Sequence, residues 1–291
     1  MKPTVFIQAN ARQYLGAKIS AHSYKHNARD PDSFDVQILN AEDFPRLMNP
    51  GQSILRGGGI RQWDPDDLQG FTPLRFYPPQ AMGFKGVAVV TDPDVFALGD
   101  VGELFERDLQ GRAIWAVPRP GHNDRNDYIA TSVMLLDCSK LKHWRFDDEL
   151  DALFGHRFDY VDWIELKRED PDSIGLLEPE WNDFDRLTPR TKLLHTTKRR
   201  TQPWKTGLPI DFTLRRSWPV DLFNRLLMRY RPHPDPNQEA FVYSLLAEMY
   251  DSGQVTKDEL SEEMAANHIR ADSLDLIDRY RGWNARTALA A

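Results

Sequence analysis

The chain has 291 residues, 41% of them hydrophobic, and a formal net charge of -7. This length and hydrophobic content allow one large domain, or one domain with an appendage, to bury a sizeable core. The acidic balance excludes a nucleic-acid-binding protein of the basic kind, so no nucleic acid partner is expected. The single cysteine, Cys138, excludes an intramolecular disulfide framework and fits a reducing compartment.

Targeting and membrane signals are weak in this sequence. Residues 1–16 contain too short an apolar run for a signal peptide. No apolar run reaches the about 18 residues that a membrane-spanning helix needs, so we expect no transmembrane segment. Together with the cysteine usage, these features predict a soluble cytoplasmic protein.

Segments typical of strands and helices alternate along the first two thirds of the chain. Residues 4–9 are apolar and β-branched at their start, which predicts a strand, and residues 11–27 carry Leu15 and Ile19 at i,i+4 spacing, which predicts a helix. Further strands are predicted at residues 34–39, 86–91, 113–117 and 131–136. This alternation favours an α/β sheet between helices, with ligands beyond the carboxyl ends of the strands.

Residues 53–61, SILRGGGIR, form a predicted three-glycine loop. The segment lacks the Lys-Ser/Thr pair of a phosphate-binding P-loop and does not match G-x-G-x-x-G after a strand. Most such loops are flexible connectors, and a mobile lid over a site is the alternative.

Two aspartates, Asp92 and Asp94, follow the buried strand at residues 86–91. In extended backbone, residues i and i+2 point to the same side, so both carboxylates can face one ion. Mg²⁺ and Mn²⁺ prefer oxygen ligands and commonly bridge carboxylates to substrate phosphates. A simple turn at Asp92-Pro93-Asp94 is the other interpretation, because Asp and Pro are common in turns.

A short helix is predicted at residues 101–107, after these aspartates. Asp100 begins the sequence D-V-G-E, with Glu103 three residues later. This spacing is similar to a capping box, in which the two side chains would bond to each other's backbone amides.

The segment 186–231 is basic, with twelve Lys or Arg residues against two Asp residues, a net charge of +10. Such a stripe in an acidic protein suggests contact with an anionic partner: a diphosphate, an acidic acceptor or the headgroups of a membrane. The alternative is a solvated face balanced by the acidic C-terminal part.

The last part of the chain has helical periodicity. Residues 219–230 and 237–250 each place apolar side chains on one face, and two shorter amphipathic pieces follow to residue 280. We expect a catalytic domain over residues 1–210 and a helical C-terminal extension over residues 211–291. Acceptor recognition and self-association as a homo-oligomer are the two roles left open for the extension.

Six blocks resemble, in order, the glycogenin-like family 8 of retaining glycosyltransferases. The central block is VVTDPDVFALGDVGELFERDLQGRAIWAV, in which a strand ends in D-x-D and a short helix follows. The other blocks are TVFIQANARQY, TPLRFYPP, TSVMLLDCSKLKHW, LLEPEWNDF and LLHTTKRRTQPW. Together they cover about residues 4 to 204, and their common order is more specific than any single block.

The resemblance implies a GT-A fold, a Rossmann-like mixed sheet flanked by helices. It also implies transfer of a hexose-type sugar from a nucleotide sugar, usually a UDP-sugar, with retention at the anomeric carbon. The acceptor is left open, with a glycan and an anionic acceptor as the two alternatives. Asp92, Asp94 and His195 match the family's metal ligands, and this mixed oxygen and nitrogen set suits Mn²⁺ at least as well as Mg²⁺. Without the resemblance, His195 would be an ordinary partly buried histidine.

The resemblance also implies residues that bind the donor. Ala9, Asn10 and Tyr14 match the positions that hold the base and ribose, and Arg75 matches the donor-binding arginine. Asn10 is equally suited to cap a helix, and both roles are compatible. An arginine in a Pro-rich loop is otherwise commonly solvated.

The sequence departs from the family pattern at the sugar end. Asp162 falls at the catalytic Asp of the family's Asp-Gln pair, but Trp163 replaces the glutamine and Ala130 replaces an asparagine. Lys198 stands where a glycine usually follows the metal histidine, and Gln202 replaces the lysine before Pro-Trp. We infer from these changes that Lys198 or one of the two arginines after it takes over the phosphate contact.

Two other functions remain open at this point. The altered sugar end is compatible with a degenerate glycosyltransferase that binds nucleotide or sugar without turnover. A nucleotidyltransferase also uses paired aspartates and a metal, but it would need a nucleoside triphosphate.

Overall fold

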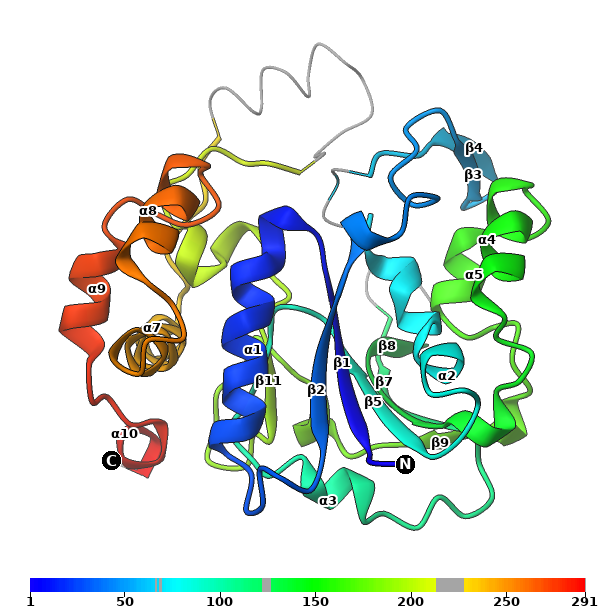
Figure 1. The fold of residues 1–291 in the computed structure, drawn as a ribbon, viewed down its shortest axis with the longest axis horizontal. Coiled ribbons are helices and arrows are strands. Elements are labelled where there is room, and N and C mark those ends of the chain that lie inside the picture. The colour runs from blue at the N-terminus through cyan, green and yellow to red at the C-terminus, as the bar shows by residue number, and fades with distance from the viewer. Residues whose placement is uncertain (66, 68–69, 122–126, 213–227, 291) are drawn as a thin grey trace.

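The computed structural model describes residues 1–65, 67, 70–121, 127–212 and 228–290. Its central strands are β1 (Thr4–Ala9), β2 (Asp35–Asn40), β5 (Val87–Thr91), β7 (Ile114–Arg119), β8 (Tyr128–Asp137) and β9 (Ile174–Leu176). They form a six-stranded sheet in the order β2-β1-β5-β8-β7-β9 (Figure 1). Strands β2, β1 and β5 are parallel, and β8 is antiparallel to both of its neighbours. The predicted mixed α/β sheet is therefore confirmed, including each of the five predicted strands.

Helices cover both faces of this sheet. Helix α1 (Tyr14–His26) follows a 3-10 turn at Ala11–Gln13 and lies on one face, while α2 (Pro78–Ala81), α4 (Phe146–Phe154) and α5 (Tyr160–Ile164) lie on the other (Figure 1). Alternate residues of β1 enter the two cores: Phe6 joins the cluster with α4 and α5, while Val5 and Ile7 join the cluster with α1. This two-residue period explains why β1 is buried at every position.

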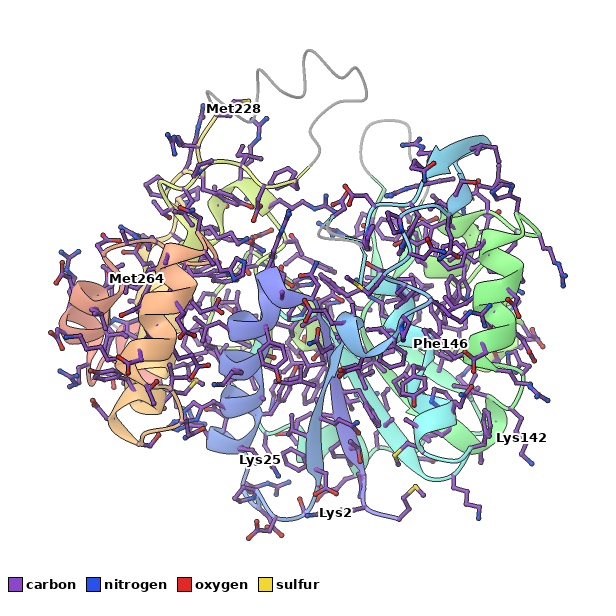
Figure 2. The ribbon with its side chains drawn as sticks, turned by 45° about the horizontal axis from the view of Figure 1, so that its top comes forward. Lys2, Lys25, Lys142, Phe146, Met228 and Met264 are labelled. Carbon is purple, nitrogen blue, oxygen red and sulfur yellow. The ribbon has the colours of Figure 1, made fainter. Side chains whose placement is uncertain are left out.

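Side chains fill the space between these layers. Figure 2 shows Phe146 among the side chains on the inner side of α4, whereas Lys25 and Lys142 lie at the edge of the molecule. Phe146 is buried and makes edge contacts with the rings of Phe44 and Tyr77. The hydrophobic face of α4 is thus fixed against the sheet by aromatic packing.

A second, three-stranded sheet adjoins the large one, in the order β10-β11-β6. Its strands are β6 (Val95–Ala97), β10 (Asp183–Phe184) and β11 (Leu193–His195). The predicted helix after β6 is α3 (Gly102–Phe105), which is shorter than expected. The expected capping box is only half formed: the Asp100 side chain accepts from the Gly102 amide at 2.9 Å, whereas Glu103 forms an ion pair with Lys192 at 2.7 Å.

The three-glycine segment is a β-hairpin rather than a loop. Strands β3 (Ser53–Arg56) and β4 (Gly59–Gln62) pair in register, with a turn at Gly57 and Gly58. These two glycines have φ angles of +59° and +74°, and a two-residue hairpin turn with positive φ at both positions favours glycine. The glycines therefore serve the turn, and the strands on either side of it are ordered by pairing.

The C-terminal helices are α7 (Pro236–Asp251), α8 (Lys257–Ala265), α9 (Ser273–Tyr280) and α10 (Ala285–Ala290). The predicted helix at 237–250 is confirmed as α7, and the two shorter pieces are α8 and α9. Leu15 and Ile19 of α1 share one buried cluster with these helices, which pack beside α1 (Figure 1). The predicted helix at 219–230 lies largely outside the described residues, and the domain boundary near residue 210 stays a prediction.

Among the described residues, no helix has both the length and the apolar composition that a membrane span needs.

The close approach of β7 and β9 predicts the effect of one glycine substitution. A Cβ atom at Gly175 would lie 2.3 Å from the Trp115 ring, which packs over the β9 backbone. We expect Gly175→Ala to lower the free energy of unfolding by about 1–3 kcal/mol, because the ring must move within a packed core. Urea denaturation measures this loss.

Gly59→Ala is the matched control, since Gly59 also lies in a strand but a Cβ atom added there would meet no other atom within 4 Å. We expect it to change stability by less than about 0.5 kcal/mol. Equal losses in the two variants would contradict the packing argument.

Candidate functional site

Three strands of the large sheet meet at Asp92. Strands β1 and β5 are parallel neighbours, so their carboxyl ends lie at one edge of the sheet. Gln8, near the end of β1, donates a side-chain hydrogen bond to Asp92, which directly follows β5. The backbone amide of Asp92 donates to the Ser132 carbonyl oxygen of β8 at 3.0 Å. This edge is the place where ligands bind in open α/β sheets.

The second sheet brings His195 to the same edge. Strand β11 is antiparallel to β6 and pairs His195 with Val95, so the histidine lies opposite the residue that follows Asp94. Its Nε2 atom lies 3.3 Å from an oxygen of Asp94 and 3.9 Å from an oxygen of Asp92. Their potential ligand atoms all lie within 4.8 Å of one another. The three residues predicted as metal ligands are thus brought together from distant parts of the chain.

Asn182 sets the orientation of the His195 ring. The Nδ1 atom of His195 lies 2.9 Å from Asn182 Oδ1, and the amide nitrogen of Asn182 donates to Ser132 Oγ at 2.9 Å. Nδ1 therefore carries the donated hydrogen, and Nε2 faces the two carboxylates. A nitrogen lone pair opposite two carboxylates is repelled unless a proton or a cation lies between them. A divalent cation fits this set, and the support of the other ring nitrogen is typical of metal-bound histidines.

Arg75, on the 3-10 helix Thr72–Phe76, directs most of its hydrogen bonds to Asp92. Its Nε and Nη2 atoms lie 3.0 and 2.7 Å from one oxygen of Asp92, and Nη1 donates to Thr131 Oγ1 at 2.9 Å. Burial raises the pKa of Asp92, and the positive charge of the nearby Arg75 offsets this only in part. Arg75 thus lies beside the candidate metal ligands and stabilises the charge of one of them.

A cavity of about 290 Å³ opens beside these residues. It is lined by four arginines, three carboxylates and several aromatic side chains; the arginines are Arg56, Arg75, Arg119 and Arg199. Two amide side chains in its wall, Gln13 and Gln202, have a buried oxygen without a hydrogen-bond partner among the described residues. Buried polar atoms are normally paired, so these oxygens point to a polar ligand. Sequence reasoning missed Gln13 and gave Gln202 no role, although it donates to Asp94 at 3.3 Å.

The predicted nucleoside-binding residues lie close to the cavity but do not line it. Ala9 is buried at the end of β1, and Tyr14 at the start of α1 is 39% exposed. Asn10 is buried and donates to the Asp67 carbonyl oxygen at 3.4 Å, while its own side-chain oxygen has no partner among the described residues. It precedes the 3-10 turn without a capping hydrogen bond. Its role in nucleoside binding stays a prediction.

The sugar end of the site differs in detail from the expectation. The carboxylate of Asp162 is about half exposed and pairs with Lys167 at 3.2 Å, outside the cavity lining. Trp163 is buried and stacks on Phe76 with ring centroids 4.3 Å apart. Because Trp163 takes the inner face of α5, the preceding residue is turned outward. The carboxylate that lines the cavity is Glu165, which the sequence did not single out.

The three basic residues that follow His195 also differ in whether they line the cavity. Arg199 lines the cavity, whereas Lys198 does not and donates its backbone amide to Asp185 at 3.0 Å. The guanidinium of Arg200 lies 3.9 Å from the sulfur of Met228. Of the three residues considered for the phosphate contact, Arg199 is therefore the one whose side chain faces the cavity.

Part of the basic stripe at 186–231 is neutralised inside the protein. Lys205 is fully buried and forms an ion pair with Asp211. Lys192 pairs with a glutamate of α3 at 2.7 Å. Residues 213–227 of the stripe lie outside the described residues. A contact of this stripe with an anionic partner or a membrane surface stays a prediction.

Comparison with solved structures finds chains to which this one is similar. The chain is similar to the galactosyltransferase LgtC in complex with donor and acceptor sugar analogues, at 16% identity over 69% of this chain and 89% of that chain, with a TM-score of 0.47. It is similar to the glycosyltransferase GlyE of Streptococcus pneumoniae TIGR4, at 20% identity over 79% of this chain and 61% of that chain, with a TM-score of 0.48. No protein family profile and no curated protein matches the chain.

The support of His195 by Asn182 predicts a loss of cation affinity on substitution. Asn182→Ala removes the acceptor of the Nδ1 hydrogen and leaves the ring free to rotate or change tautomer. Loss of such a supporting partner typically weakens metal binding about 10- to 100-fold. Calorimetric titration with Mn²⁺ measures the change.

Asn49→Ala is the control, because Asn49 is exposed, does not line the cavity, and its side chain accepts only from the Gly51 backbone amide among the described residues. It should bind Mn²⁺ as the unaltered chain does. An Asn182→Ala variant with unchanged affinity would show that the ring orientation does not matter.

Proposed function

We propose that this chain is a metal-dependent glycosyltransferase of the GT-A type. It moves a hexose from a nucleotide sugar, most simply a UDP-sugar, to a glycan or anionic acceptor with retention at the anomeric carbon. The observation that carries the proposal is the convergence of Asp92, Asp94 and His195 beside an arginine-lined cavity at the carboxyl edge of the sheet. The six ordered sequence blocks support it independently.

The cation would be held by one oxygen of each aspartate and by Nε2 of His195, with Mn²⁺ preferred over Mg²⁺ because a nitrogen takes part. When bound, it supplies positive charge that stabilises the departing nucleoside diphosphate. Arg75 holds Asp92 in place through hydrogen bonds to both carboxylate oxygens, and one of these oxygens, Oδ2, also faces Nε2 of His195 at 3.9 Å. Gln202 donates to Asp94 without adding charge, so the Asp94 carboxylate keeps its attraction for a cation.

Arginines of the cavity wall are suited to the diphosphate. A guanidinium presents forked donors that match phosphate oxygens, and it stays charged at any physiological pH. We assign the principal phosphate contact to Arg199, which lies in the same segment as His195 and faces the cavity. Its guanidinium also lies 5.7 Å from the centre of the Phe212 ring, which limits its orientations.

Glu165 is the carboxylate best placed for the sugar. It is 7% exposed, lines the cavity and accepts an ion pair from Lys167 at 3.0 Å. A double displacement with retention needs a carboxylate under the anomeric carbon, by analogy with retaining glycosidases. We therefore assign to Glu165 the role that the family resemblance gave to Asp162. Attack from the leaving-group face would instead use Glu165 to position the sugar.

A catalytically inactive binding protein is the second candidate. The observation that favours it is Ala130, which lines the cavity where the family has an asparagine. Trp163, the other departure from the family pattern, does not favour an inactive protein, because its side chain packs in the core rather than at the cavity. Such a protein would bind the nucleotide without releasing free sugar.

Nucleotide binding should depend on the cation through Asp94. In a thermal-shift screen we expect UDP and UDP-hexoses to raise the unfolding temperature more with Mn²⁺ than without it, since ligands of the native state stabilise it. Asp94→Asn should lose the Mn²⁺-dependent part of the shift, whereas Asp148→Asn, at an exposed site on α4, should keep it.

The UDP-sugar that gives the largest shift is then incubated with the protein and Mn²⁺, and free hexose is measured. An enzyme should release free hexose slowly, whereas an inactive binding protein should release none. A shift that is independent of Mn²⁺ in the unaltered chain would exclude the metal-dependent proposal.

Adjacent arginines test the phosphate contact. Arg199→Ala should weaken UDP binding about tenfold or more, because a hydrogen bond to a charged group contributes about 1.5–3 kcal/mol. Arg200→Ala removes the same charge one residue away and should have a much smaller effect, since its guanidinium lies against Met228. Calorimetric titration with UDP in Mn²⁺ measures both, and equal losses would mean that only the overall charge of the segment matters.

A further inference from the structure

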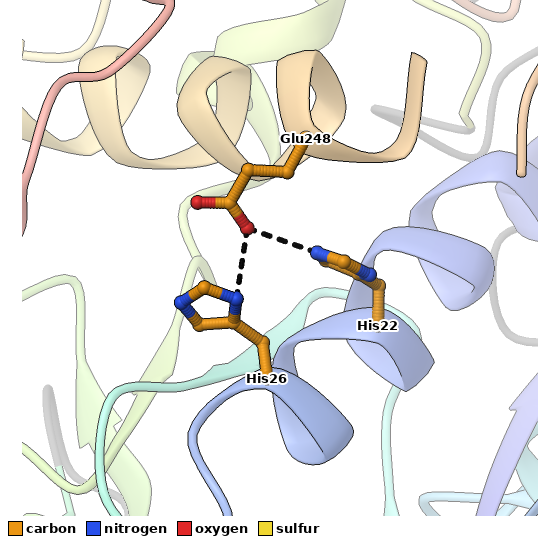
Figure 3. Close-up of side chains that lie close together, drawn as sticks. All are labelled: His22, His26 and Glu248. Carbon is orange, nitrogen blue, oxygen red and sulfur yellow. Dashed lines mark hydrogen bonds and ion pairs between the residues drawn. The ribbon is translucent and has the colours of Figure 1, made fainter. Parts of the chain in front are cut away.

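A second cluster of metal-binding side chains lies at the other end of α1. His22 and His26 are one helical turn apart on α1, and Glu248 reaches them from α7 (Figure 3). One oxygen of Glu248 lies 3.0 Å from Nε2 of His22 and 3.0 Å from Nδ1 of His26. All three ligand atoms lie within 4.8 Å of one another. The cluster is separate from the cavity beside Asp92, because none of its residues lines that cavity.

Gln254 orients the His22 ring in the same way that Asn182 orients His195. Its side-chain oxygen lies 3.3 Å from Nδ1 of His22, and its nitrogen donates to Ser252 Oγ at 2.9 Å. Nδ1 of His22 is therefore the donor, and Nε2 is directed at the Glu248 carboxylate.

The donor set selects the ion. Two imidazole nitrogens and one carboxylate oxygen are typical of Zn²⁺, whereas Ca²⁺ and Mg²⁺ prefer oxygen ligands alone. Tetrahedral Zn²⁺ with bonds of about 2.0–2.1 Å places its ligand atoms about 3.3 Å apart. The two nitrogen-to-oxygen distances of 3.0 Å are close to that separation.

An open position remains for a fourth ligand. His26 and Glu248 line a cavity of about 390 Å³, together with Trp283 and Arg286 near the C-terminal helix α10. The side chain of His26 is 47% exposed and that of Glu248 is 40% exposed, so water or a small anion can reach an ion held between them. A zinc ion with three protein ligands and one exchangeable ligand fits this arrangement.

We propose that His22, His26 and Glu248 form a zinc site that joins α7 to α1. The site would hold the C-terminal helices against the α/β sheet, since α1 packs on the sheet and α7 leads into α8 and α9. This proposal does not depend on the glycosyltransferase function. It needs only the side chains of the two helices.

Zinc stoichiometry tests the site. Equilibrium dialysis against Zn²⁺ should give one bound ion fewer per chain for His26→Gln and for Glu248→Gln than for the unaltered chain. His268→Gln is the matched control, because His268 also lies 3.0 Å from a single glutamate of the C-terminal helices but has no second histidine. This variant should bind as many ions as the unaltered chain. Equal stoichiometry in all four proteins would overturn the proposal.

A measurement on the unaltered chain keeps the test independent of how the variants fold. Crystals grown with Zn²⁺ should show anomalous density at the zinc edge between His22, His26 and Glu248. Density confined to the Asp92 site, or to no site, would equally overturn the proposal.

Discussion

The arrangement of the site depends on the buried carboxylate of Asp92. A charge in the interior of a protein costs free energy unless it is paired. Strand β5 is apolar on both faces, so the chain that leaves it delivers Asp92 to the interior edge of the sheet. A buried carboxylate is tolerated only with hydrogen bonds and opposite charge. Gln8 and Arg75 provide these, and Thr131 holds Arg75 while donating to the Ile164 carbonyl oxygen of α5. One buried charge thus orders side chains from β1, from β8 and from the 3-10 helix Thr72–Phe76.

Much of the fold could be predicted from the sequence, as could the meeting of Asp92, Asp94 and His195 at one edge of the sheet. Long apolar runs such as residues 86–91 identify buried strands, because a strand covered on both faces needs no polar positions. The helical spacing of apolar residues over 237–250 likewise predicts α7, because a helix that packs against another element needs apolar side chains on the packed face. Asp92, Asp94 and His195 were found together because strand ends and motif order constrain where such residues meet.

The sugar end could not be predicted, because it depends on which way a short helix turns. Asp162, Trp163 and Glu165 lie within one turn of α5, and only packing of the Trp163 ring on Phe76 decides which carboxylate faces the cavity. The three-glycine segment was misjudged for a related reason. Glycines indicate a turn, but the pairing of β3 with β4 depends on the residues on either side. His22, His26 and Glu248 gave no signal, since their meeting requires α7 to pack on α1.

The three candidate metal ligands come from two sheets, and this has a thermodynamic consequence. Asp92 ends a strand of the large sheet, His195 ends a strand of the small one, and Asp94 lies in the short connection between β5 and β6. An ion that binds all three is coupled to the docking of one sheet on the other, and such coupling is reciprocal. A substitution that loosens the docking of the small sheet, however far from the cavity, weakens ion binding by at most the free energy that the ion contributes to docking. Ion affinity is therefore a measure of how well the two sheets fit together.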